Sequence, residues 1–254
     1  MTARRWMTIL ALAAMAAGCA SSAGTGPAPQ AAAKPPLKEI IPGYLAGYLP
    51  AGTAPNSLNL LPAPPAAGSA AQARDDEAAK AAETFACAMD VKISEADTPA
   101  LYVLLRRTLA DNGLSTYPTK NKYKRARPFT VNGAPICTPN EEQVLRNDGS
   151  YPSGHSAIGW GWALVLTQVA PDRANEILAR GRAFTNSRVV CNVHWLSDTE
   201  EGRTMASAVV AKLQSNPDFQ ADVQAAKAEV AAARAKGVKP AGDCAAEAAQ
   251  MAAV

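Results

Sequence analysis

The feature that most constrains the fold is an apolar segment, residues 153–169, whose side chains are apolar nearly all round a helical wheel. A helix of this kind is normally buried at the centre of a domain. Ser153 is a good N-cap residue for such a helix, and Pro171-Asp172 ends it. The rest of the chain must therefore supply elements that pack around one central helix.

The surrounding segments predict more helices. From residue 97 or 98, leucines recur at spacings of 3, 1 and 4 on one helical face, and Asn112-Gly113 is expected to end that helix. Further helices are predicted over residues 70–90, 173–184, 194–213 and 219–236. No stretch alternates apolar and polar residues as a half-buried strand would. We therefore expect an all-α, single-domain helical bundle.

The first residues resemble an export signal. Arg4 and Arg5 precede an apolar run over 6–17, which is too short to span a bilayer, since a spanning helix needs about 20 residues. The sequence Ala-Ala-Gly-Cys at 16–19 resembles a bacterial lipobox, in which Cys19 would carry the lipid. The alternative is ordinary cleavage in the same region with release to the periplasm. We favour the lipoprotein, and the sequence leaves both interpretations open.

Composition divides the chain into four parts. Residues 1–19 are the predicted signal peptide, and the Ala/Pro-rich residues 20–38 are a tether with almost no large apolar side chains to bury. Residues 39–236 are the predicted folded domain, and residues 237–254 are a C-terminal tail. A chain of 254 residues has room for one domain of this size with extensions.

Cysteine usage favours disulfide bonds. Four cysteines follow the predicted signal, and an even number in an exported protein is typical of disulfide bonding. Three pairings are possible, and spacing does not choose among them. We favour Cys137–Cys191, because both lie near the motifs described below, and hence Cys87–Cys244. Buried free thiols are the alternative, whereas the absence of a C-x2-C pair argues against a zinc site.

Both histidines of the chain, His155 and His194, lie within a series of three short motifs. The motifs are K-x6-R-P at 120–128, P-S-G-H at 152–155 and S-R-x5-H-x3-D at 187–198. A chain that places both of its histidines in one such series is expected to use both imidazole rings for chemistry.

The P-S-G-H motif predicts an anion site. The first N–H groups of the helix that follows Ser153 are unpaired and carry the positive end of the helix dipole. Gly154 would allow a ligand to approach the main chain closely, and His155 on the first turn could exchange a proton with a bound oxyanion. The alternative is a capped helix with a half-buried histidine.

The cationic candidates are Lys120, Arg127 and Arg188. Arginine offers a planar fork of donors for phosphate oxygens and lysine a compact charge, so together they could neutralise a dianion without a metal. Taken alone, the basic run at 120–127 is also typical of a solvated face or a nucleic-acid patch, although a net charge of +3 is too small to imply nucleic acid. The other cations of the run are expected to be solvated: Lys122, Lys124 and Arg125.

The third motif predicts a histidine oriented by a carboxylate. If residue 194 begins a helix, His194 and Asp198 lie on one face of it at i,i+4. A carboxylate bonded to one imidazole nitrogen fixes the tautomer and leaves the other nitrogen free to attack. The alternative is an ordinary helix-stabilising pair.

In this order, the three motifs resemble the signature of the phosphatidic acid phosphatase type 2 / vanadium haloperoxidase superfamily. More narrowly, the chain resembles the bacterial class A non-specific acid phosphatases over about residues 43–230. Shorter matches support this: Pro-Asn-Ser at 55–57, Leu-Leu-Pro at 60–62, Gly-Ser-Ala at 68–70, Asp-Asp at 75–76 and Gly-Ser-Tyr at 149–151.

The resemblance implies a role for each candidate. His194 would be the nucleophile that forms a phosphohistidine, Asp198 would orient it, and His155 would be the general acid and then the general base. The phosphate would be held by Lys120, Arg127, Ser153, Gly154 and Arg188. The resemblance implies the helical fold of this superfamily for residues 39–236, and no metal or other cofactor.

The resemblance also implies an exported enzyme that acts at acidic pH on many small phosphomonoesters and transfers phosphate to alcohols. Nucleic acid is not an expected partner, the membrane is reached only through a lipid on Cys19, and a homo-oligomer is expected by analogy. The alternatives are a vanadate-dependent haloperoxidase, a lipid phosphatase, or a non-catalytic envelope lipoprotein that binds phosphate. The preferred ester and the balance of hydrolysis and transfer stay open.

Overall fold

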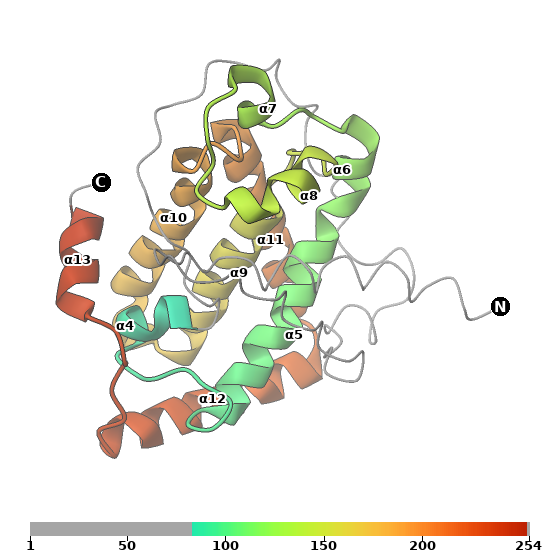
Figure 1. Cartoon of the computed structure of the whole chain (residues 1–254). Helices are drawn as coiled ribbons and strands as arrows, with labels where there is room; N and C mark the ends of the chain where they lie inside the picture. The colour runs from blue at the N-terminus through green and yellow to red at the C-terminus, as the bar shows by residue number, and fades with distance from the viewer. Residues whose placement is uncertain (1–82, 253–254) are drawn as a thin grey trace.

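The computed structural model describes residues 83–252, and the regular structure of this part of the chain is entirely helical. Helix α9 (Gly154–Val169) lies at its centre, in contact with α5 (Pro99–Ser115), α10 (Ala174–Val190) and α11 (Leu196–Leu213) (Figure 1). Helix α12 (Pro217–Ala235) packs across α5 and α9. The prediction of an all-α bundle around residues 153–169 is confirmed.

The central helix is buried because its neighbours approach it closely. Trp162 on α9 is enclosed, donates from Nε1 to the carbonyl oxygen of Leu105 on α5 (2.9 Å), and meets Phe85 edge to face. At Gly159 a Cβ atom would lie 2.1 Å from the ring of Phe184, so the absence of a side chain allows α10 to pack here. These contacts hold α5 and α10 against the central helix.

Short helices cover the end of the bundle at which α9 begins. They are α6 (Tyr117–Tyr123), α7 (Pro128–Asn132), the 3-10 turn η3 (Pro139–Glu141) and α8 (Glu142–Arg146) (Figure 1). A second, smaller apolar cluster stabilises this end, formed by Phe129, Ile136, Leu145, Cys191 and Val193. The disulfide Cys137–Cys191 joins the η3 side of this layer to the end of α10.

The remaining short elements lie at the side of α10. They are η2 (Glu83–Phe85), α4 (Ala86–Met89), η4 (Pro171–Arg173) and α13 (Cys244–Ala252). The disulfide Cys87–Cys244 joins α4 to α13, and Glu247 pairs with Arg180 on α10 at 3.3 Å. Both predicted cysteine pairings are confirmed. Part of the predicted C-terminal tail is thus helix α13, attached to the bundle.

Three predicted helix limits are wrong. Helix α5 continues through Asn112-Gly113 to Ser115, because Asn112 is buried and its Nδ2 donates to the carbonyl oxygen of Thr108 (2.8 Å). Helix α10 continues past residue 184 to Val190, and α11 begins at Leu196 instead of residue 194.

Other predictions lie outside the described residues: the signal peptide with Cys19, the tether, and most of the helix predicted over 70–90. Within residues 83–252, no helix has the length and apolar character needed to cross a membrane.

Candidate active site

The predicted site residues converge where α9 and α11 begin and α10 ends. Ser153 is the N-cap of α9, and its Oγ accepts a hydrogen bond from the backbone N–H of Ser156 (3.2 Å). The Ser153 N–H donates to the carbonyl oxygen of Asp198 (2.8 Å), which ties the start of α9 to α11. A Cβ atom at Gly202 would lie 2.6 Å from the Ser153 carbonyl oxygen, so glycine there allows the two helices to meet.

Gly154 is the first residue of α9, and its surroundings are open. An added Cβ atom would meet only Thr116 Oγ1 and Lys120 Cε, at 3.6 and 3.8 Å, which are ordinary contacts. Packing within the described residues therefore does not require glycine at this position. Gly154 thus lies beside Lys120, at the positive end of the central helix.

Arg188 lies in the last turn of α10 with its guanidinium almost fully buried, since the residue is 2% exposed. Its Nε and Nη2 atoms have no hydrogen-bond partner among the described residues. Buried donors without partners cost about 1–3 kcal/mol each, and charged ones more. Such a group is expected to bind an anion. The Arg188 carbonyl oxygen also accepts from the N–H of His194 (3.1 Å), which brings the two residues together.

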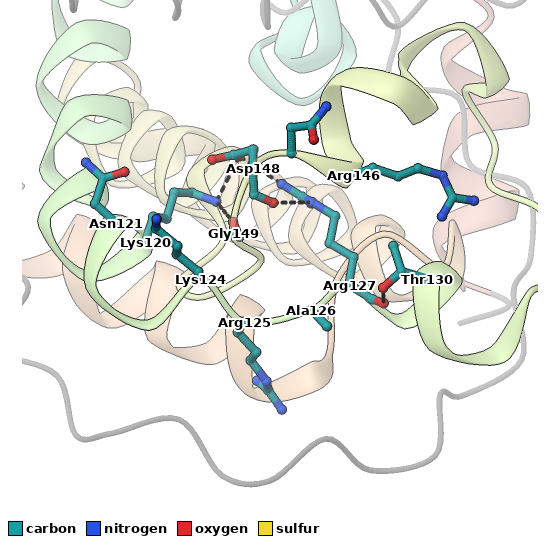
Figure 2. Close-up of a pocket in the computed structure, with 11 residues that line it drawn as sticks. Lys120, Asn121, Lys124, Arg125, Ala126, Arg127, Thr130, Arg146, Asp148 and Gly149 are labelled. Carbon is teal, nitrogen blue, oxygen red and sulfur yellow. Dashed lines mark hydrogen bonds and ion pairs between the residues drawn. The ribbon is translucent and has the colours of Figure 1, made fainter.

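Lys120 on α6 and Arg127 before α7 are joined by one carboxylate (Figure 2). Asp148 Oδ2 accepts from Lys120 Nζ at 3.3 Å and from Arg127 Nη2 at 2.9 Å. Lys120 Nζ also donates to the carbonyl oxygen of Gly149 (2.5 Å), and Arg127 Nε to that of Leu145 (2.9 Å). Both cations line a pocket of about 550 Å³ whose other charged groups include Lys124 and Arg146. Burial, followed by the charge of Arg127, lowers the pKa of Lys120 to about 8.

His194 is buried between Arg127 and Asp198. Arg127 Nη1 lies 3.0 Å from His194 Nε2, and His194 Nδ1 lies 3.2 Å from Asp198 Oδ2. Because arginine can only donate, Nε2 must accept, and the proton of the neutral ring is on Nδ1 and directed at the carboxylate. Burial and the nearby cations Arg127, Lys120 and Arg188 hold the pKa of His194 well below its usual value. The neutral ring therefore has its lone pair on Nε2.

The His194–Asp198 contact forms differently from the predicted one. His194 precedes α11, with Trp195 as N-cap, so the two residues do not share a helical face. Asp198 instead folds back from the first turn, and its Oδ2 accepts from the Trp195 N–H (2.9 Å) as well as from His194. The pair is thus positioned by helix capping.

His155 is the second residue of α9 and is half-buried. Its ring has no hydrogen-bond partner in the described part of the chain. Burial, then the charge of Arg188, with smaller effects from Arg127 and Lys120, lower its pKa well below the usual value, so His155 lies in the same cationic environment. A negatively charged ligand in this environment would favour its protonated form.

Sequence analysis missed two residues that contact the predicted site. Asp148 bridges Lys120 and Arg127, as described above. Arg125, predicted to be solvated, donates from Nη1 to Asp198 Oδ1 at 2.6 Å, and its side chain is only 8% exposed. Lys122 and Lys124 are exposed, as expected. No local signal separates Arg125 from these lysines, because its partner lies on α11.

Comparison with known proteins shows the family of the chain. Residues 99–215 match the PAP2 superfamily. The chain is 39% identical to the "Non-specific acid phosphatase" of Providencia stuartii over 225 residues, 79% of this chain and 91% of that protein. It is 39% identical to the "Acid phosphatase" of Zymomonas mobilis subsp. mobilis, over 67% of this chain and 65% of that protein. It is 38% identical to the "Non-specific acid phosphatase" of Salmonella typhimurium, over 63% of this chain and 65% of that protein. The chain therefore belongs to the non-specific acid phosphatases of the PAP2 superfamily.

Proposed function

We propose that this acid phosphatase hydrolyses a broad range of phosphate monoesters through a phosphohistidine formed on His194 Nε2, without a metal ion. The observation that carries the proposal is the buried guanidinium of Arg188, two of whose nitrogens have no partner among residues 83–252. Its carbonyl oxygen accepts from the N–H of His194, whose lone pair is on Nε2. A phosphoryl group supplies the acceptor oxygens that these donors lack and the electrophile that Nε2 needs.

The cations on the two sides of His194 suit the charge of a phosphate ester. Arg188 approaches from α10, and Lys120 and Arg127 approach from the α6–α7 segment. The N–H groups of Gly154 and His155, at the start of α9, supply further donors to an anion, whereas those of Ser153 and Ser156 are already bonded to Asp198 and Ser153. A cationic site of this kind stabilises charge on the equatorial oxygens in the transition state.

The first chemical step transfers the phosphoryl group to the enzyme. Arg127 Nη1 releases His194 Nε2 and donates to a phosphate oxygen instead. Nε2 then forms a bond to phosphorus while the bond to the ester oxygen breaks, and the electron pair of that bond goes to the leaving oxygen. Protonated His155 gives its proton to this oxygen, so an alcohol leaves. Asp198 Oδ2 accepts from Nδ1–H of His194 and stabilises the positive charge that develops on the ring.

The second step releases phosphate. Water attacks phosphorus, neutral His155 takes its proton, and the electron pair of the P–N bond returns to His194 Nε2. An alcohol in place of water would give phosphotransfer. His155 must be protonated in the first step, and its pKa is lowered in the empty site, so activity is expected at acidic pH.

We also propose that the enzyme is exported, with a lipid on Cys19 and an envelope location. The signal-like sequence at 1–19 and the two disulfides support this, because disulfides are typical of oxidising compartments.

The test is hydrolysis of p-nitrophenyl phosphate in excess EDTA by the wild type and by His194→Ala. We expect metal-independent turnover at acidic pH, lost by roughly 1,000-fold or more in the variant, since the nucleophile is removed. Rapid acid-free quenching followed by phosphorus NMR should detect phosphohistidine in the wild type only. Lys239→Ala, an exposed residue paired with Asp90, is the control. A folded wild type that binds phosphate without turnover would instead be a binding protein.

A further inference from the structure

Arg125 is bound to the carboxylate that orients the proposed nucleophile. Its Nη1 donates to Asp198 Oδ1 at 2.6 Å and to Ser197 Oγ at 2.8 Å. Its guanidinium lies over the rings of Trp195 and Tyr151, at 5.5 and 6.0 Å from their centroids. The next residue, Ala126, accepts a hydrogen bond from Trp195 Nε1 through its carbonyl oxygen (2.8 Å). These contacts hold the segment before α7 against the start of α11.

The two carboxylate oxygens of Asp198 have different hydrogen-bond partners. Oδ1 accepts from Arg125, while Oδ2 accepts from the N–H of Trp195 and faces Nδ1 of His194. Asp198 is 0% exposed, so its carboxylate is shielded from bulk water and these protein donors hold it. The direction in which Oδ2 faces the imidazole therefore depends on how Oδ1 is held.

The geometry points to Arg125 as a positioning residue that fixes the plane of the Asp198 carboxylate, and through it the ring of His194. This inference rests on the proposed function, in which His194 Nε2 attacks phosphorus. Arg125 does not need to touch the substrate, because Lys120, Arg127 and Arg188 supply the cations around His194.

Loss of Arg125 would change the charge balance as well as the geometry. Burial raises the pKa of Asp198, and Arg125, with a smaller effect from Lys120, lowers it. Without Arg125, protonation of Asp198 would occur at a higher pH. A protonated Asp198 no longer favours the proton on His194 Nδ1, so the tautomer with its lone pair on Nε2 keeps the support of Arg127 Nη1 but loses that of the carboxylate. As the pH is lowered, an enzyme without Arg125 would therefore lose its activity at a higher pH than the wild type does.

The experiment compares Arg125→Met and Arg125→Lys with the wild type, using p-nitrophenyl phosphate across the acidic range. We expect kcat to fall roughly 10- to 100-fold in Arg125→Met, because small displacements of a reacting group are costly. In Arg125→Met, KM should change much less than kcat, and the acid limb of the pH profile should move to higher pH. Arg125→Lys should have a kcat and an acid limb between those of Arg125→Met and the wild type. The low-field proton resonance of His194 Nδ1–H should shift or disappear.

Arg107→Met is the matched control. Arg107 pairs with Asp222 at 2.7 Å between α5 and α12, so its loss also removes a partly buried arginine–aspartate pair. It should leave kcat, the acid limb and the resonance unchanged.

Two results must be distinguished. A folded wild type without turnover contradicts the proposed function. An active wild type with unchanged kcat and acid limb in folded Arg125→Met contradicts only the role of Arg125. If Arg125→Met does not fold, Arg125→Lys decides, because lysine keeps the charge but is shorter and lacks the planar guanidinium that lies over the rings of Trp195 and Tyr151. A wild-type kcat and acid limb in that variant would overturn the inference.

Discussion

Lys120 is the site residue whose charge responds most directly to alkaline pH. Its ammonium is buried, and the desolvation and the neighbouring Arg127 outweigh Asp148 and lower its pKa from 10.5 to about 8. Because the folded-state pKa is the lower one, the folded chain binds fewer protons than the unfolded chain between these values. The cost of burying this charge is therefore present below about pH 8 and is relieved as the pH rises through that window.

The same titration should weaken phosphate binding. Above about pH 8 the free enzyme loses the charge of Lys120, so its affinity for inorganic phosphate should fall, although phosphate itself is already a dianion there. Calorimetric titration at increasing pH would measure this. In Lys120→Met, affinity should be lower throughout and this pH dependence should vanish, whereas Lys239→Met should behave as the wild type. If the affinity of Lys120→Met for phosphate fell with rising pH as it does in the wild type, the titrating group would be one other than Lys120.

The motifs predicted residues that the fold brings together, such as Arg127, His194 and Asp198, but not all of the residues that hold them. Motif spacing selected Arg127 and Arg188, because they stand at fixed spacings from Lys120 in K-x6-R-P and from His194 in S-R-x5-H-x3-D. Arg125 has the same charge as its exposed neighbours, and its role depends on Asp198, which lies 73 positions further along the chain. Only the fold brings such residues together.

At the level of helices, periodicity predicted the elements well but not all of their limits. Buried faces repeat along a helix, so α9 was recognised from its apolar residues alone. Ends depend on single contacts. Helix α11 begins after His194 because Asp198 accepts the Trp195 N–H from within the first turn, and tryptophan is not a usual N-cap. This difference of two residues changes how His194 meets its carboxylate.

The close contact between α9 and α11 requires glycine at position 202, so a larger residue there should affect both stability and activity. In Gly202→Ala the new Cβ atom would lie 2.6 Å from the Ser153 carbonyl oxygen and 2.8 Å from Ser156 Cβ, so α11 must move away from α9. We expect a loss of about 1–3 kcal/mol in the free energy of unfolding. We also expect kcat per folded molecule to fall, because Ser153 and Asp198 are joined at this contact.

Gly181→Ala separates these two effects. Its Cβ atom would lie 2.5 Å from Ala163 Cβ, further along α9, so it strains the same central helix away from the site. Thermal unfolding should show a comparable destabilisation in both variants, with kcat reduced only in Gly202→Ala. Equal kcat in the two folded variants would mean that the start of α11 tolerates displacement.

For the whole molecule, the two disulfides are expected to contribute differently. Cys137–Cys191 spans 54 positions and closes beside Asn192, Val193 and His194, whereas Cys87–Cys244 spans 157 positions and attaches α13 beside α10, away from α6 and α7 (Figure 1). Long loops gain most from closure in the chain-entropy account, so each bond is expected to contribute about 2–5 kcal/mol to stability.

Paired serine substitutions would separate stability from activity. Cys87→Ser with Cys244→Ser should lower the melting temperature while kcat at moderate temperature is retained, since α13 contacts α10 and Arg180, not the site. Cys137→Ser with Cys191→Ser should lower both, because Cys191 is the C-cap of α10, three residues before His194, and belongs to the small core under this segment. Calorimetry and p-nitrophenyl phosphate assays on the same samples would measure this. If both pairs lower kcat equally, the bundle transmits changes at α13 to the site, and the two ends of the molecule are not independent.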